Sequence, residues 1–169
     1  MSLGSVGSAR QIPFILKPMK TLSVTTEPKQ LRYVVMSGTC GSPHCNSAKV
    51  ETIPYPPDID KGSGLATMLK TVSGLLASEK PNKVVVLLSV PAMRGTPSVR
   101  PTIEALIKLA CHQEHSEFES LHPVALRARE KKFQTKLGKS PEQVFNNGVA
   151  FRPAISRDTY LTGWSGLPE

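Results

Sequence analysis

Two cysteines and a histidine lie close together in a stretch rich in glycine and proline. Cys40 and Cys45 are separated by four residues, and His44 comes directly before the second cysteine. Thiolate and imidazole groups are natural zinc ligands, but structural zinc sites usually show two matched pairs of ligands, which this chain lacks. We therefore expect no cofactor and keep zinc as the alternative. The candidate ligands are Cys40, Cys45, His112 and His115, with Cys111 beside the second pair.

Sequence motifs of known catalytic sites are absent. The chain has no Gly-x-Ser-x-Gly, no His-Glu-x-x-His and no glycine-rich phosphate-binding loop, and its acidic residues are scattered. Cys40 and His44 could serve as nucleophile and base, but residues four apart in such a loop rarely face each other. We therefore expect a protein that is not an enzyme and has no catalytic residues. The alternative is a small α/β enzyme or metal-binding protein that uses the Cys40–Cys45 loop, with Arg94 and Arg100 as phosphate ligands.

Basic side chains are concentrated in the last third of the chain. The residues expected to bind nucleic acid or another anionic partner are Arg127, Arg129, Lys131, Lys132, Lys136, Lys139, Arg152 and Arg157. Each phosphate that such a side chain neutralises releases a counterion, so binding would weaken steeply with salt. Only 5% of the residues are aromatic, which favours contacts to the phosphate backbone over base stacking.

The net charge of +8 is uneven along the sequence. Residues 1–26 and 123–169 are strongly basic, whereas residues 27–122 are almost balanced. Cationic ends on a balanced body are typical of proteins that lie on a large anionic partner. We expect a non-enzymatic architectural subunit of a large assembly, with RNA as the partner in a ribonucleoprotein such as an organellar ribosome. The alternatives are an acidic protein polymer such as a microtubule, or a viral assembly.

Three aromatic residues stand in a final segment without helical or strand periodicity. These are Phe151, Tyr160 and Trp164, among prolines and glycines. We expect residues 150–169 to be extended and these side chains to anchor the segment in pockets of a neighbouring subunit.

Hydrophobic patterning predicts a small α/β sheet of about three or more strands with two packed helices. Strands are expected at 20–26, 31–36 and 83–90, and amphipathic helices at 64–79 and 98–117. If the second and third strands pair in parallel, the loops 37–45 and 89–100 become neighbours at the carboxyl edge of the sheet. A basic helix over 123–137 follows, and then a short helix that Ser140 and Gln143 cap.

The same patterns divide the chain into three parts. They are an extended basic arm over 1–19, an α/β body over 20–119, and a basic helical extension with an extended tail over 120–169. The longest apolar run, 84–88, is too short to span a membrane. We expect an intracellular protein, and the serine-rich, acid-free start of the chain keeps a mitochondrial or other organellar location open.

Overall fold

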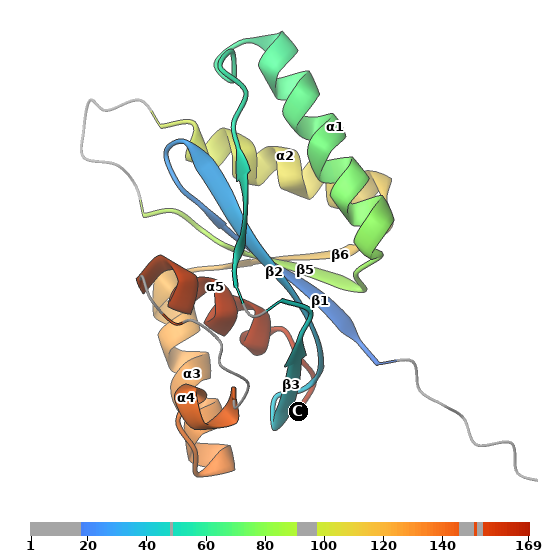
Figure 1. The fold of residues 1–169 in the computed structure, drawn as a ribbon. Coiled ribbons are helices and arrows are strands. Elements are labelled where there is room, and N and C mark those ends of the chain that lie inside the picture. Colours follow the sequence, from blue (N-terminus) through green and yellow to red (C-terminus); the bar gives the residue numbers. More distant parts are fainter. Residues whose placement is uncertain (1–17, 48, 91–97, 146–150, 152–153) are drawn as a thin grey trace, which may run out of the picture.

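A computed structural model describes residues 18–47, 49–90, 98–145, 151 and 154–169. These residues form a six-stranded sheet with helices on both faces, so the predicted α/β class is confirmed (Figure 1). The strand order is β3-β2-β1-β5-β6, and β4 also pairs with β2. The strands are β1 (Lys20–Thr26), β2 (Gln30–Thr39), β3 (Ser42–Cys45), β4 (Glu51–Pro54), β5 (Lys83–Leu87) and β6 (Glu117–Leu121). Among the helices of the described ranges, none is long and apolar enough to cross a bilayer.

Strands β1 and β5 form the centre of the sheet. β1 pairs antiparallel with β2 and parallel with β5, which in turn pairs parallel with β6. Three consecutive valines, Val84 to Val86, are fully buried, as the uninterrupted apolar run of β5 predicts for a strand covered on both faces. In β1 the pattern alternates, so that Leu22 and Val24 face one helical layer and Ser23 and Thr25 face the other.

Helices α1 (Gly62–Glu79) and α2 (Arg100–Gln113) cover one face of the sheet (Figure 1). α1 buries Met68, Val72 and Leu76, which share one side of the helix at four-residue spacing. Together with the buried side of α2 and with Leu22 and Val24, they form one apolar cluster. This layer is the predicted core.

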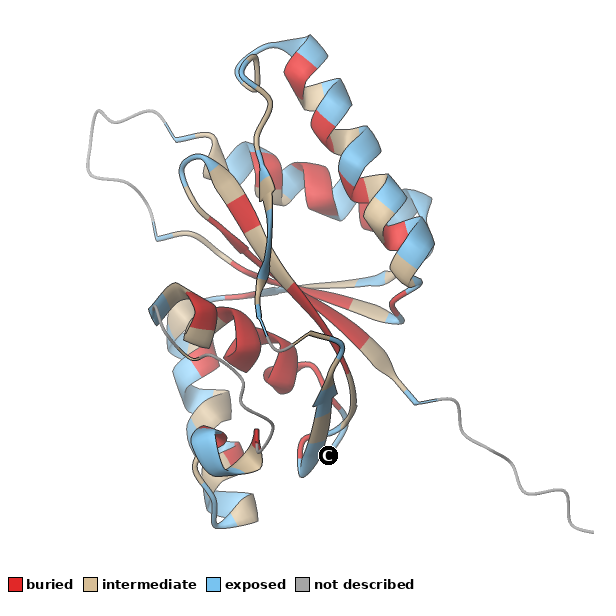
Figure 2. Ribbon diagram, viewed as in Figure 1, coloured by how far each residue is buried: buried red, intermediate tan, exposed pale blue. Residues whose placement is uncertain are grey.

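Helices α3 (Pro123–Leu137), α4 (Pro141–Val144) and α5 (Ala154–Ser165) lie on the other face (Figure 1). α5 packs against β1, β2 and β5, and Figure 2 shows it buried along most of its length. α3 contacts α5 and buries Leu126 and Phe133. The predicted cap of α4 is present, because the backbone N–H of Ser140 donates to Oε1 of Gln143 at 2.8 Å.

The structure differs from the sequence-based prediction in its strand pairing and its final segment. β5 pairs in parallel with β1 rather than with β2, because β3 and β4 already pair with the free side of β2. Residues 154–165, expected to be extended, form α5. Its many threonine, serine and glycine residues are buried, so the helix shows little amphipathic pattern. Strands β3, β4 and β6 are short and were not predicted.

Candidate functional site

The carboxyl ends of the parallel strands β1, β5 and β6 meet at one edge of the sheet. Ligands of open α/β sheets bind at such edges. Here Oε1 of Glu104, on α2, accepts hydrogen bonds from Oγ1 of Thr26 at 2.9 Å and from the backbone N–H of Ser89 at 2.8 Å. The Arg100 guanidinium donates to Thr26 at 3.4 Å. Glu104 thus ties the ends of β1 and β5 together beneath the first turn of α2.

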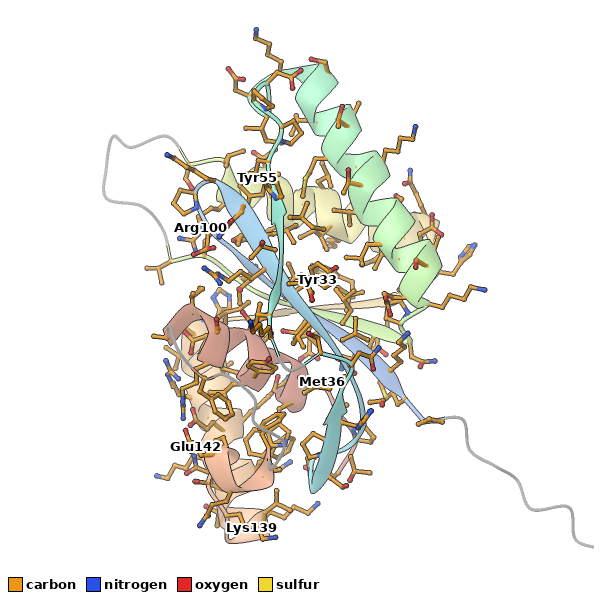
Figure 3. All side chains as sticks on the ribbon, viewed as in Figure 1. Tyr33, Met36, Tyr55, Arg100, Lys139 and Glu142 are labelled. Carbon is orange, nitrogen blue, oxygen red and sulfur yellow. The ribbon has the colours of Figure 1, made fainter. Side chains whose placement is uncertain are left out.

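One of the two loops expected at this edge lies elsewhere. β2 runs antiparallel to β1, with Ser37 opposite Lys20, so the 37–45 segment lies at the amino end of β1. The prediction that it neighbours the 89–100 loop is therefore wrong. Arg94 falls outside the described residues, whereas Arg100 lies at the predicted edge, at the same end of the sheet as Tyr55 (Figure 3).

Hydroxyl groups fill the contact between β1 and α5. Oγ of Ser23 donates to the backbone carbonyl of Thr159 at 2.5 Å. Oγ1 of Thr159 donates to the carbonyl of Ile155 at 2.8 Å, so it accepts from Oγ1 of Thr25 at 2.7 Å. All three of these Ser and Thr side chains are buried. The carboxyl half of β1 therefore presents neutral hydroxyls, not carboxylates, to the helix that covers it.

The residues of this region do not fit a divalent metal ion. Hard divalent cations are held in proteins by oxygen ligands, above all by carboxylates that face a common point. In the described part of the chain, no group of three or more His, Cys, Asp or Glu side chains converges in that way. Glu104 bonds to Thr26 on the α2 side of the sheet, and Asp158 of α5 lies 3.3 Å from the guanidinium of Arg127.

The cysteines also lie apart. Cys40 and Cys45 belong to the cluster on the α5 side of the sheet, whereas Cys111 is buried in the cluster on the α1 and α2 side. Burial raises the pKa of both Cys45 and Cys111 to about 11, so these thiols stay protonated at neutral pH. His112 and His115 lie at the end of α2, on the Cys111 side. The four candidate zinc ligands thus come from both sides of the sheet.

The predicted phosphate-binding cations lie mainly on α3, and many already have acidic partners. Arg127 and Arg157 both contact Glu130, and Arg157 donates to its carboxylate at 2.6 Å. Arg129 pairs with Glu119 of β6. Lys131 and Lys139 are exposed and have no ion pair within the described residues, and Arg152 lies outside them.

A single carboxylate bridges two further lysines of α3. Glu169 contacts Nζ of Lys132 through one oxygen, and its other oxygen accepts from Nζ of Lys136 at 2.7 Å. The hydrogen bonds from Lys132 and Lys136 lower the pKa of Glu169 to about 2. This acid was not among the predicted site residues, because nothing in the sequence places it beside α3.

The predicted aromatic anchors are inside the protein itself. Tyr160 and Trp164 are buried, and the indole Nε1 of Trp164 donates to the backbone carbonyl of Cys40 at 2.7 Å. The rings of Trp164 and Phe133 meet edge-to-face with centroids 5.0 Å apart. Phe151 packs half-buried beside Phe145. These rings anchor α5 to α3 and the sheet and not, as expected, to a neighbouring subunit.

The chain resembles several solved structures. No family model and no curated protein sequence matches the chain. Thermus thermophilus RuvC in complex with a Holliday junction substrate matches with a TM-score of 0.60 and 12% identity, over 87% of this chain and 91% of that one. A yeast mitochondrial Holliday junction resolvase matches with a TM-score of 0.60 and 14% identity, over 87% and 77%. At such identities the likeness shows the shared fold.

These matches overturn the function expected from the sequence. The prediction of a non-enzymatic architectural subunit is wrong, because the solved structures that match with a TM-score of 0.60 are Holliday junction resolvases, which are enzymes, and not structural subunits. The expected partner is corrected as well, since the matched RuvC is bound to a DNA junction and not to the RNA of a large particle. Among the functions considered from the sequence, the small α/β enzyme agrees better with these findings. The findings do not support a role of the Cys40–Cys45 loop in its activity.

Proposed function

We propose that the protein acts on branched DNA as a junction-specific nuclease. The observation that carries this proposal is the likeness in fold over 87% of the chain to a RuvC bound to a Holliday junction. The match also covers 91% of that RuvC, so it extends over most of both chains.

The position of the basic helix α3 supports DNA as the substrate. β6 leads directly into α3, so the basic helix begins at the same edge where β1 and β5 end. A DNA strand bound at that edge would meet Arg100 on one side and the first cations of α3, Arg127 and Arg129, on the other. The residues proposed to contact phosphates are Arg127, Arg129, Lys131, Lys132, Lys136, Lys139, Arg152 and Arg157.

Binding and cleavage are separate parts of the proposal and need separate assays. The full chain is mixed with a synthetic four-way junction, or with a linear duplex of the same sequence, and binding is followed by fluorescence anisotropy in EDTA. Cleavage is followed with each strand end-labelled in turn, with Mg²⁺ or Mn²⁺ added. We expect tighter binding to the junction and paired nicks near its centre.

Each result has a definite meaning. Equal affinity for junction and duplex would overturn the proposed substrate. Junction-selective binding without nicks would overturn the nuclease part, in agreement with the absence of a carboxylate cluster from the described residues.

A mitochondrial location is part of the same proposal. It is supported by the yeast mitochondrial resolvase among the matched structures and by the acid-free start of the sequence. Imaging of the full chain with a C-terminal fluorescent tag tests it, and a diffuse cytosolic signal would overturn it.

A further inference from the structure

The cations of α3 are not equivalent, because three of them lie along one side of the helix. Arg129, Lys132 and Lys136 are spaced by three and four residues, so they fall within roughly 60° around the helix axis. We call these three residues the α3 row. It is about 10 Å long, which corresponds to about three nucleotides along one DNA strand. Lys139 follows the left-handed Gly138 that ends the helix, and it lies at the end of α3 opposite to the end that follows β6 (Figure 3).

Glu169 occupies this row. Its two carboxylate oxygens contact the ammonium groups of Lys132 and Lys136, as two oxygens of a DNA phosphate would. The lysine side chains remain 64% and 46% exposed, and that of Glu169 44% exposed, so DNA can reach all three. A glutamate carboxylate is ionised at neutral pH in any case, and the hydrogen bonds from the two lysines lower the pKa of Glu169 further.

We infer that Glu169 competes with DNA phosphates for Lys132 and Lys136 and thereby limits the affinity of the α3 row for the DNA backbone. This inference rests on the proposed function in one respect only, which is that DNA is the ligand. It does not require that the DNA be branched or that it be cut. Exposed ion pairs are weak, so a phosphate can replace Glu169. The Glu169 carboxylate thus weakens non-specific binding of DNA to the α3 row but does not prevent it.

The test is a set of variants in which charge is removed from the acid, the lysines or both. Glu169→Gln, the Lys132→Gln/Lys136→Gln pair and the triple variant are compared with the unchanged chain. The probe is a linear duplex at several salt concentrations, measured by anisotropy. Glu114→Gln is the matched control, because it removes an exposed carboxylate next to α2, on the opposite face of the sheet.

We expect Glu169→Gln to tighten duplex binding by about twofold to fivefold, the range of a weak exposed ion pair. The slope of log affinity against log salt should change by less than about one, since phosphates that displace Glu169 meet the same lysines in both complexes. The lysine pair should weaken binding, and in its background Glu169→Gln should add no more than Glu114→Gln does.

Three results would overturn the inference. One is an unchanged affinity of Glu169→Gln, and another is a gain matched by Glu114→Gln, which would reflect net charge alone. The third is a gain that persists when both lysines are replaced. These outcomes are independent of the proposed function, because they concern duplex binding, whereas the proposed function fails if junctions are neither preferred nor cut.

Discussion

Both faces of the sheet carry an apolar cluster, but the central strand β1 is packed with different chemistry on its two sides. Against α1 and α2, β1 presents Leu22 and Val24, and the contact is made of aliphatic side chains. Toward α5 the same strand presents Thr21, Ser23 and Thr25. The residues that face them from α5 and the turn after it include threonine and glycine. The first layer is held by apolar burial, which is non-directional. The second layer also has a buried apolar cluster, but at β1 it adds specific hydrogen bonds and a close backbone approach, so this contact tolerates substitution less well.

This difference also bears on function. The α5 layer lies next to the carboxyl edge of the sheet, and α3 packs against α5. The position of the residues proposed to bind DNA therefore depends on the layer that tolerates substitution less well. The stability of this layer should depend on its aromatic rings, its glycines and its hydroxyl groups.

The largest effect is expected for Trp164. Trp164→Ala removes a buried ring from the contact with Phe133 and leaves the Cys40 carbonyl without its indole donor, at a cost of about 3–5 kcal/mol in the free energy of unfolding. Trp164→Phe keeps most of the ring and should cost less. Urea denaturation measures both. A loss under 1 kcal/mol for the alanine variant would show that the Trp164 ring does not anchor α5 to α3 and the sheet.

Two glycine substitutions should have opposite signs. A Cβ on Gly166 would lie 2.6 Å from Cγ2 of Val85 and 3.0 Å from Cγ2 of Thr21, so Gly166→Ala should destabilise the fold by about 1–3 kcal/mol. A Cβ on Gly74 meets nothing within 4 Å in the exposed part of α1, so Gly74→Ala should stabilise by up to about 1 kcal/mol. Thermal melts of both variants compare the layers directly. Equal shifts in melting temperature would contradict the close approach of α5 to the sheet.

The hydroxyl pair between β1 and α5 should show coupling. Thr159→Val removes the acceptor of the Thr25 hydroxyl and should cost about 1–2 kcal/mol, because a buried donor is left unpaired. In a Thr25→Val background that donor is gone, so the further cost of Thr159→Val should fall well below its cost alone. A double-mutant cycle of unfolding free energies measures the coupling. Additive costs would mean that the hydrogen bond contributes little.

The α1 and α2 layer was predictable from the sequence, whereas the α5 layer was not. Met68, Val72 and Leu76 repeat at helical spacing and predicted α1, and the valines of β5 predicted a central strand. In α5, Thr159 and Gly163 are buried because of what faces them on β1 and β2, which local periodicity does not record.

The candidate site was predictable in its residue types but not in its pairing. The cations of α3 stand out in the sequence, yet the partners of Lys132 and Lys136 lie more than 30 residues away. The strand order was not predictable either, because the pairing of Leu22 with Val84, which places β5 beside β1, joins segments about 60 residues apart. Basic charge alone does not distinguish DNA from RNA as the partner, which is why the wrong assembly was predicted.

The smallest effect is expected for Glu119 of β6, which pairs with Lys83 of β5 and with Arg129 of α3. Burial acts to raise the pKa of its carboxyl, but hydrogen bonds from Arg129 and Lys83 outweigh this and leave the pKa lowered. A lowered pKa in the folded state gives stability that is present above the unfolded value of about 4.3 and is lost as the pH falls through the folded value. Glu119→Gln should therefore cost less than about 1 kcal/mol at pH 6 and flatten the loss of stability below pH 4.5. Urea denaturation at pH 6 and pH 3.5 measures both. If the acid dependence is unchanged, Glu119 does not hold Arg129, and that arginine is as free to meet a phosphate as Lys131.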